Sequence, residues 1–201
     1  MSGVLSCKSP DIREQVLPSF SASASLQPAQ HQSRRLRSAC SLAPTQHPLS
    51  SLLEEVSRDH FPYPPATPEE IAQFEQRVGW KLDPDLRAFY LYCNGAELIE
   101  RLPDCPYQIF PLSKIKRARV AIYGGDDDKW GPASAYAICD VQDGNYVLLD
   151  VSRQDNGRYP LMDGYHKAWP NPKYCGPVAR SFSEFLEGIL RTRWNLYWIG
   201  E

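Results

Sequence analysis

Helix stop and start signals follow one another closely in the stretch GWKLDPDLRAFYLYCNG. Gly79 can adopt the left-handed conformation that ends a helix, and Asp83 can cap a new helix shortly afterwards. Pro84 suits the first helical position, because its missing N–H would have no partner there. The large ring of Trp80 in the connection can wedge the two helices together. The stretch therefore predicts a tight helical hairpin that ends at the Asn-Gly pair of residues 94–95.

Three other segments carry helical signals. The stretch TPEEIAQFEQRV, before Gly79, begins with a capping box formed by Thr67 and Glu70. The stretch SFSEFLEGILRTRW begins with a second box, formed by Ser181 and Glu184, and places apolar residues on one face. The stretch LSSLLEEVSRDH, residues 49–60, has helical spacing and is stopped by the prolines of FPYPP.

The middle of the chain changes from helical to alternating hydrophobicity. The runs AYAICDV and YVLLDV flank an Asp-Gly pair, which predicts a β-hairpin with a tight turn. The run YQIFPLSKI predicts an edge strand or a strand terminus, because the proline near its end cannot donate to a neighbour, and GRYPLMDGYH predicts a further strand. We expect an α+β fold, with the helical hairpin and the C-terminal helix packed on an antiparallel β-sheet. This order of elements excludes a parallel nucleotide-binding sheet.

The chain changes composition near residue 48. Residues 1–48 are rich in Ser, Pro and Gln, have few large aliphatic side chains, and are expected to be a disordered head; an organelle transit peptide is the alternative. Residues 49–201 are expected to form the folded domain. Residues 1–50 carry five basic and two acidic residues, whereas residues 51–201 carry 17 and 22. The acidic body disfavours nucleic acid as a partner and favours basic proteins.

Cysteine usage and hydropathy point to the cytoplasm. The six cysteines form no C-x-x-C pair and have no histidine at ligand spacing, so neither a zinc site nor a secreted disulfide framework is expected. No apolar run approaches the roughly 18 residues that a bilayer span requires. We expect a reducing, cytoplasmic location and no membrane contact.

Catalytic motifs are missing from the sequence. It contains no phosphate-binding glycine loop, no H-E-x-x-H and no G-x-S-x-G, and its four histidines are scattered. Only these scattered histidines and cysteines would support an enzyme. We therefore expect a non-enzymatic protein without cofactor or metal.

The segment YGGDDDKWGP, residues 123–132, is the most suggestive cluster. Its three carboxylates could hold a hard cation, but they lack the alternating spacing that aims side chains at one point. A solvated loop or an acidic contact surface for a basic partner are the other interpretations, and the neighbouring tryptophan favours a contact surface. The basic run KIKRAR predicts a strand with a basic solvent face, and WPNPKY predicts an ordered loop over the sheet. The residues selected as partner contacts are Asp126, Asp127, Asp128, Trp130, Tyr165, His166 and Trp169.

The ordered series of motifs resembles the SUKH superfamily, which joins the yeast Smi/Knr cell-wall regulators to bacterial immunity proteins. Members open with EEIxxFExxxG, continue through LPxDxRxFxxxxNG, enter strands, and close with a helix like SFSEFLEGIL. The resemblance spans about residues 49–192. The matching residues of the helical hairpin are Glu69, Glu70, Ile71, Phe74, Glu75, Gly79, Leu82, Pro84, Leu86, Phe89, Asn94 and Gly95.

This resemblance implies a non-enzymatic protein-binding domain. Bacterial members bind and block a toxin domain, often a nuclease or a deaminase, so we expect an immunity protein whose partner is a cognate toxin domain. The alternative that the resemblance implies is a regulatory or scaffolding protein similar to the yeast regulators, with residues 1–48 as a docking or phosphorylated tail.

Overall fold

A computed structural model describes residues 49–98, 107–141, 144–192 and 196–199 of the chain. The expectations for residues 1–48 lie outside this range. The helices are α1 (Leu49–Asp59), α2 (Pro68–Val78), α3 (Pro84–Tyr92), α4 (Ala118–Tyr123) and α5 (Phe182–Arg191), with a 3₁₀ turn η1 at Asp128–Trp130. The strands are β1 (Phe61–Pro62), β2 (Ala96–Leu98), β3 (Tyr107–Ile109), β4 (Lys116–Arg117), β5 (Ala135–Asp140), β6 (Tyr146–Asp150), β7 (Leu161–Gly164) and β8 (Pro177–Ala179).

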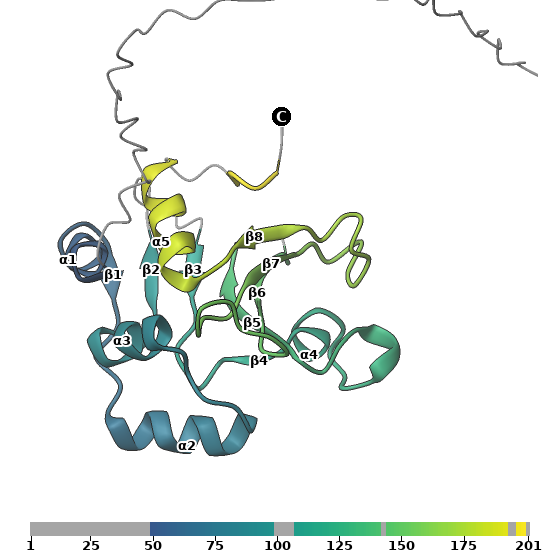
Figure 1. Cartoon of the computed structure of the whole chain (residues 1–201), viewed down its shortest axis with the longest axis horizontal. Coiled ribbons are helices and arrows are strands. Elements are labelled where there is room, and N and C mark those ends of the chain that lie inside the picture. Colours follow the sequence, from purple (N-terminus) through teal and green to yellow (C-terminus); the bar gives the residue numbers. More distant parts are fainter. Residues whose placement is uncertain (1–48, 99–106, 142–143, 193–195, 200–201) are drawn as a thin grey trace, which may run out of the picture. The chain divides into compact units, whose positions relative to one another are not determined.

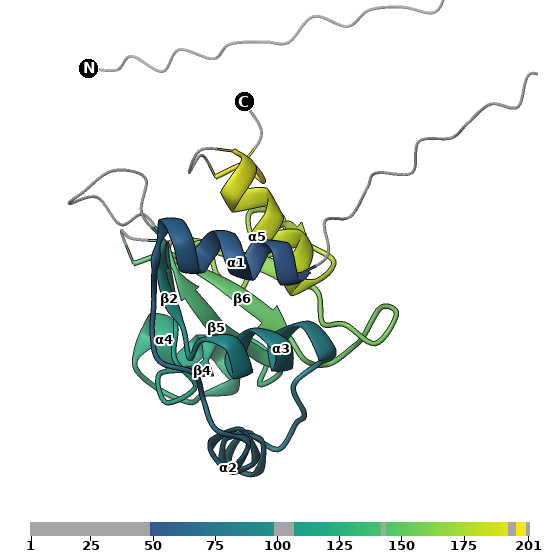
Figure 2. The same cartoon turned by 90° about the vertical axis from the view of Figure 1, so that its left-hand side faces the viewer.

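All the strands belong to one antiparallel sheet in the order β1-β2-β3-β5-β6-β7-β8 (Figure 1). Strand β4 pairs with the first half of β5, and β3 pairs with its second half. Helices α1, α3 and α5 contact one another and lie together beside the sheet (Figure 2). Phe89 of α3 meets Phe182 of α5 with ring centroids 4.8 Å apart, and both rings are fully buried. The predicted α+β class is confirmed.

The helical hairpin begins and ends largely as its signals predict. The capping box of Thr67 and Glu70 is present, and Gly79 ends α2 with a φ of 81°. The α3 helix, however, ends at Tyr92, before the Asn-Gly pair. Gly95 instead lets two backbones approach, because a Cβ there would lie 2.7 Å from the carbonyl oxygen of Ile109.

Trp80 joins α2 to the sheet. From the sequence, this ring is expected between the two helices of the hairpin. In the structure it packs edge-on against Phe74 of α2, Tyr136 of β5 and Tyr159, with centroid distances of 5.4, 5.3 and 5.6 Å. Two of these three partners lie more than 50 residues downstream, so the local sequence does not reveal them.

Two buried carboxylates at the start of α3 join distant parts of the fold. Asp83 accepts hydrogen bonds from the backbone N–H of Leu86 at 2.9 Å and of Tyr159 at 3.0 Å. Asp85 pairs with Arg158 at 3.0 Å and accepts from the hydroxyl of Ser183 at 2.6 Å. The loop between β6 and β7 and the start of α5 are thereby fixed to the helical hairpin. Burial raises the pKa of Asp83 despite its two N–H partners.

The basic run KIKRAR differs from its prediction. Lys116 and Arg117 form the short strand β4, but the chain then turns into helix α4. The prediction of one strand through residue 119 is therefore wrong, and Arg119 is buried instead of facing solvent. Strands β1, β2 and β8 have only two or three residues each, which is too short for alternation to be recognised in the sequence.

We predict that Asp83→Ala lowers the free energy of unfolding by about 2 kcal/mol, because the helix cap and the buried bond to the N–H of Tyr159 are both lost. The matched control is Thr67→Ala, which removes the exposed cap of α2 and should cost about 1 kcal/mol. Urea denaturation of the full chain measures both values. Equal losses in the two variants would contradict the role given to Asp83.

The difference between wild type and Asp83→Ala should also depend on pH. The folded pKa of Asp83 lies above its unfolded value, so the stability that the carboxyl contributes is greatest below the unfolded pKa. It should shrink as the pH rises through the folded pKa. Denaturation of both proteins across this acidic range would show a constant or growing difference if the assignment were incorrect.

Candidate functional site

The predicted contact residues lie on two loops that are bound to each other. We define the two-loop surface as residues 123–131, which begin at the last residue of α4, and residues 165–175, which join β7 to β8. The indole N–H of Trp169 donates to the carbonyl oxygen of Trp130 at 3.0 Å, and the hydroxyl of Tyr123 donates to that of Trp169 at 2.6 Å. Two segments about 40 residues apart in sequence thus form one surface.

The three consecutive aspartates are paired with cations of this chain. Arg119 of α4 pairs with both Asp126 and Asp128, and only 5% of its side chain is exposed. Arg117 reaches Asp126 at 2.6 Å, and Lys129 reaches Asp127 at 3.0 Å. Three carboxylates therefore face three cations, so this loop presents a balanced charge and not the net acidic surface that the sequence suggests.

The ion pairs also hold the loop in its conformation. The hydrogen bond from Arg119 and the charges of Arg117 and Arg119 lower the pKa of Asp126, outweighing desolvation. The backbone N–H and side chain of Lys129 lower the pKa of Asp127. Both carboxylates are therefore more acidic than ordinary aspartates, which favours the ionised form that these pairs require.

Aromatic side chains give the two-loop surface its exposed apolar area. The rings of Tyr123 and Trp130 lie 5.7 Å apart, and the ammonium group of Lys129 lies 4.6 Å from the centroid of Trp130. Tyr123 is 40% exposed and Tyr174 is 54% exposed. Neither tyrosine is among the contact residues predicted from the sequence, although each stands inside one of the segments singled out there.

The remaining predicted residues divide into a buried anchor and half-exposed neighbours. Trp169 is buried, so its part in any contact is to hold the loops together. Tyr165 is half-buried, and its carbonyl oxygen accepts from the N–H of Trp169 at 2.9 Å. His166 lies 5.7 Å from the ring of Tyr165 and bonds through its backbone N–H to the side-chain oxygen of Asn145 at 3.1 Å.

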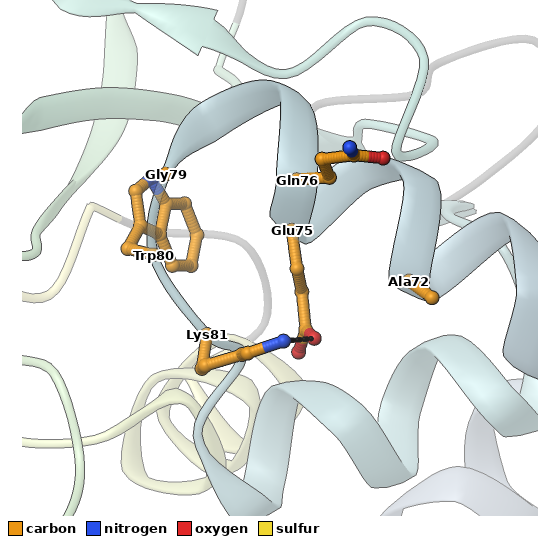
Figure 3. Close-up of a pocket in the computed structure, with 6 residues that line it drawn as sticks. All are labelled: Ala72, Glu75, Gln76, Gly79, Trp80 and Lys81. Atoms are coloured by element: carbon orange, nitrogen blue, oxygen red, sulfur yellow. Dashed lines mark hydrogen bonds and ion pairs between the residues drawn. The ribbon is translucent and has the colours of Figure 1, made fainter.

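A hollow of about 340 Å³ lies beside α2, away from this surface (Figure 3). Its two ionisable groups bind each other, since the ammonium of Lys81 lies 2.8 Å from the carboxylate of Glu75, which also accepts from the N–H of Leu82. Desolvation raises the pKa of Glu75, but the bonds from Lys81 and Leu82 and the charge of Arg87 bring it below its ordinary value. The two ionisable side chains that line this hollow therefore bind each other and hold the end of α2 to the following residues. Neither is free to act as a general acid or base. The residues that line the hollow are Ala72, Glu75, Gln76, Gly79, Trp80 and Lys81.

The described residues contain no cluster of three histidine, cysteine or acidic side chains placed to hold a metal ion. Cys93, Cys139 and Cys175 are buried and form no disulfide bond within the described residues, and burial raises the pKa of Cys93 to about 12. Such a thiol stays protonated at neutral pH and is a poor nucleophile. Within the same residues, every helix is too short or too polar to cross a bilayer.

Comparison with protein families gives one match. The model of the SMI1 / KNR4 family (SUKH-1) matches residues 65–188, which include α2 to most of α5 and both loops of the candidate surface. No curated protein matches the chain.

We predict that Arg119→Gln loosens residues 124–131 without unfolding the domain, because Asp126 and Asp128 lose their shared cation. Amide hydrogen exchange in this loop should become at least about tenfold faster, and the pKa of Asp126, followed by carboxyl NMR, should rise toward its ordinary value. Arg180→Gln, which removes the exposed pair with Glu184, is the control and should change neither quantity. An unchanged Asp126 titration in Arg119→Gln would refute this account of the loop.

Proposed function

Since the chain belongs to the SMI1 / KNR4 family (SUKH-1), we propose that it is a non-enzymatic immunity protein that binds a toxin domain and neutralises it stoichiometrically. The toxin domain we propose is a nuclease or a deaminase, as the resemblance implies. The observation that carries the proposal is the two-loop surface, which is exposed, aromatic and fixed by its own ion pairs and hydrogen bonds.

A surface that is fixed before binding loses less conformational entropy when a partner arrives. Arg119 holds residues 126 and 128, and Trp169 connects the second loop to the first. The exposed rings of Tyr123 and Tyr174 then offer large contact areas with few rotatable bonds. These properties support a surface that binds a folded protein with little rearrangement.

Charge acts at two levels in this proposal. The excess of acidic residues in residues 51–201 would attract a basic nuclease at long range and raise the association rate. At the two-loop surface itself the acids are compensated by Arg117, Arg119 and Lys129. Close contact there would depend on the aromatic rings and on hydrogen bonds. Salt should therefore slow association more than it speeds dissociation.

Neutralisation by this chain would be steric. A domain that sits over the substrate groove of a nuclease or deaminase excludes the substrate without performing any chemistry. Each molecule of this chain would then block one toxin domain, so inhibition would be complete at about one chain per toxin domain.

A regulatory or scaffolding role is the second candidate. It is favoured by residues 1–48, which are rich in serine and carry the run SRRLRS, a composition suited to phosphorylation or docking. A toxin gene adjacent to the gene for this chain would favour neutralisation, and its absence would favour scaffolding.

The proposal predicts that co-expression of the full chain protects cells from the toxin domain encoded beside it, with purified activity abolished at a molar ratio of about one. Tyr174→Ala should weaken binding about tenfold, because the ring, which is 54% exposed, would no longer pack against the toxin domain. The matched control is Tyr92→Ala, which removes an exposed tyrosine from α3 and should leave affinity unchanged. Titration calorimetry with the toxin domain measures both.

Binding that leaves the toxin's activity intact would contradict neutralisation. If the wild type and Tyr174→Ala bound the toxin domain with equal affinity, the contact would instead have to lie outside the two-loop surface.

A further inference from the structure

A row of directly paired residues crosses six strands on one face of the sheet. Each residue faces the next across an antiparallel pair, so the side chains share that face. The row consists of Phe61, Glu97, Gln108, Asp140, Tyr146 and Gly164, on β1, β2, β3, β5, β6 and β7 in turn.

The two faces of these strands differ sharply in burial. The alternate positions Ala96, Tyr107, Cys139 and Val147 are fully buried. In the row, Glu97, Gln108, Asp140 and Tyr146 are all half-exposed, and Phe61 is 50% exposed. Leu148, two residues from Tyr146 on β6 and on the same face, is fully buried, so this face is not exposed along its whole length. The row is its more exposed part, and we call these five residues the open face.

The hydrogen-bond donors to the half-buried carboxylate of Glu97 are neutral. It accepts from the hydroxyl of Tyr63 at 2.8 Å and from the side-chain amide of Gln108 at 3.3 Å. By contrast, Glu75 and Asp85 each pair with a cation of this chain. Within the described residues, no Lys, Arg or His forms an ion pair with Glu97.

The open face combines this negative charge with aromatic edges. Asp140 adds a second carboxylate, and Tyr146 lies close enough to it that the charge of Asp140, after burial, raises the pKa of the tyrosine. Phe61 and Tyr146 flank the polar centre, and the row contains no basic residue. Aromatic rings beside carboxylates suit the long side chains of Lys and Arg, whose stems pack on rings while the charged ends meet acids.

The open face continues into the two-loop surface. Gly164 ends the row and is followed directly by Tyr165 and His166, the first residues of the second loop. His166 bonds to the side chain of Asn145, the neighbour of Tyr146. The open face and the two-loop surface therefore adjoin at Gly164 and Asn145.

We propose that the open face is a docking surface for a Lys- or Arg-bearing segment of the protein partner. Glu97 supplies a charge that no cation of the described chain compensates, and the rings of Phe61 and Tyr146 supply packing for the side-chain stems. This inference rests on the proposed function for the identity of the partner, but its chemistry can be tested without it.

The test uses the full isotope-labelled chain and a hexa-arginine peptide as the probe, with hexa-glutamate as the reverse-charge control. We expect saturable NMR shifts centred on the amides of Glu97, Gln108 and Tyr146. Glu97→Gln keeps an acceptor oxygen for Tyr63 and Gln108 but removes the charge, so it should fold normally and bind about two- to fivefold more weakly. The matched control is Glu187→Gln, a half-exposed carboxylate of α5, which should bind like the wild type.

Equal binding by wild type and Glu97→Gln, shifts centred on another face, or the same shifts with hexa-glutamate would each overturn the docking surface. If the surface fails while the full chain still neutralises its toxin domain, the proposed function stands and its contact lies elsewhere. If the peptide maps to the open face while the chain neutralises no toxin, the docking surface stands and the proposed function fails.

Discussion

The short segment from Asp83 to Asp85 is the joint on which the rest of the structure depends. Asp83 caps α3 and fixes the backbone of Tyr159, while Asp85 binds Arg158 and Ser183. Two segments that lie 76 and 98 residues downstream therefore meet the start of α3 at these two carboxylates. Burying a carboxylate costs free energy unless hydrogen-bond donors or a cation satisfy it. Few other arrangements of these segments would therefore satisfy both Asp83 and Asp85.

Carboxylates in this protein serve opposite purposes according to what faces them. Asp126 and Asp128 enclose the buried Arg119, and their charge is used to shape a loop. Glu97 accepts from the neutral donors of Tyr63 and Gln108, and within the described residues it has no cation, which is why we propose that its charge meets a partner. The number of acidic residues in a segment is thus a poor guide to where a basic partner would bind.

A binding role suits this architecture because its stable core and its exposed surfaces are separate. The helical hairpin and α5 bury the aromatic core on one side, where Phe89 and Phe182 meet. The two-loop surface and the open face lie on elements that this core holds rigid. Substitutions at exposed positions such as Tyr174 could then change the partner without weakening the fold.

The sequence by itself determined what is local: the caps at Thr67, Asp83 and Ser181, the β-hairpin, the α+β class and the order of motifs typical of the family. These depend on neighbours within one helical turn or one strand pair, so spacing reveals them. Only the tertiary structure decided that Arg119 would neutralise the acidic loop and that Trp80 would pack on Tyr136. Charge pairing and ring packing depend on which distant residues the fold brings together. The hydrophobic periodicity of the sequence does not identify those residues.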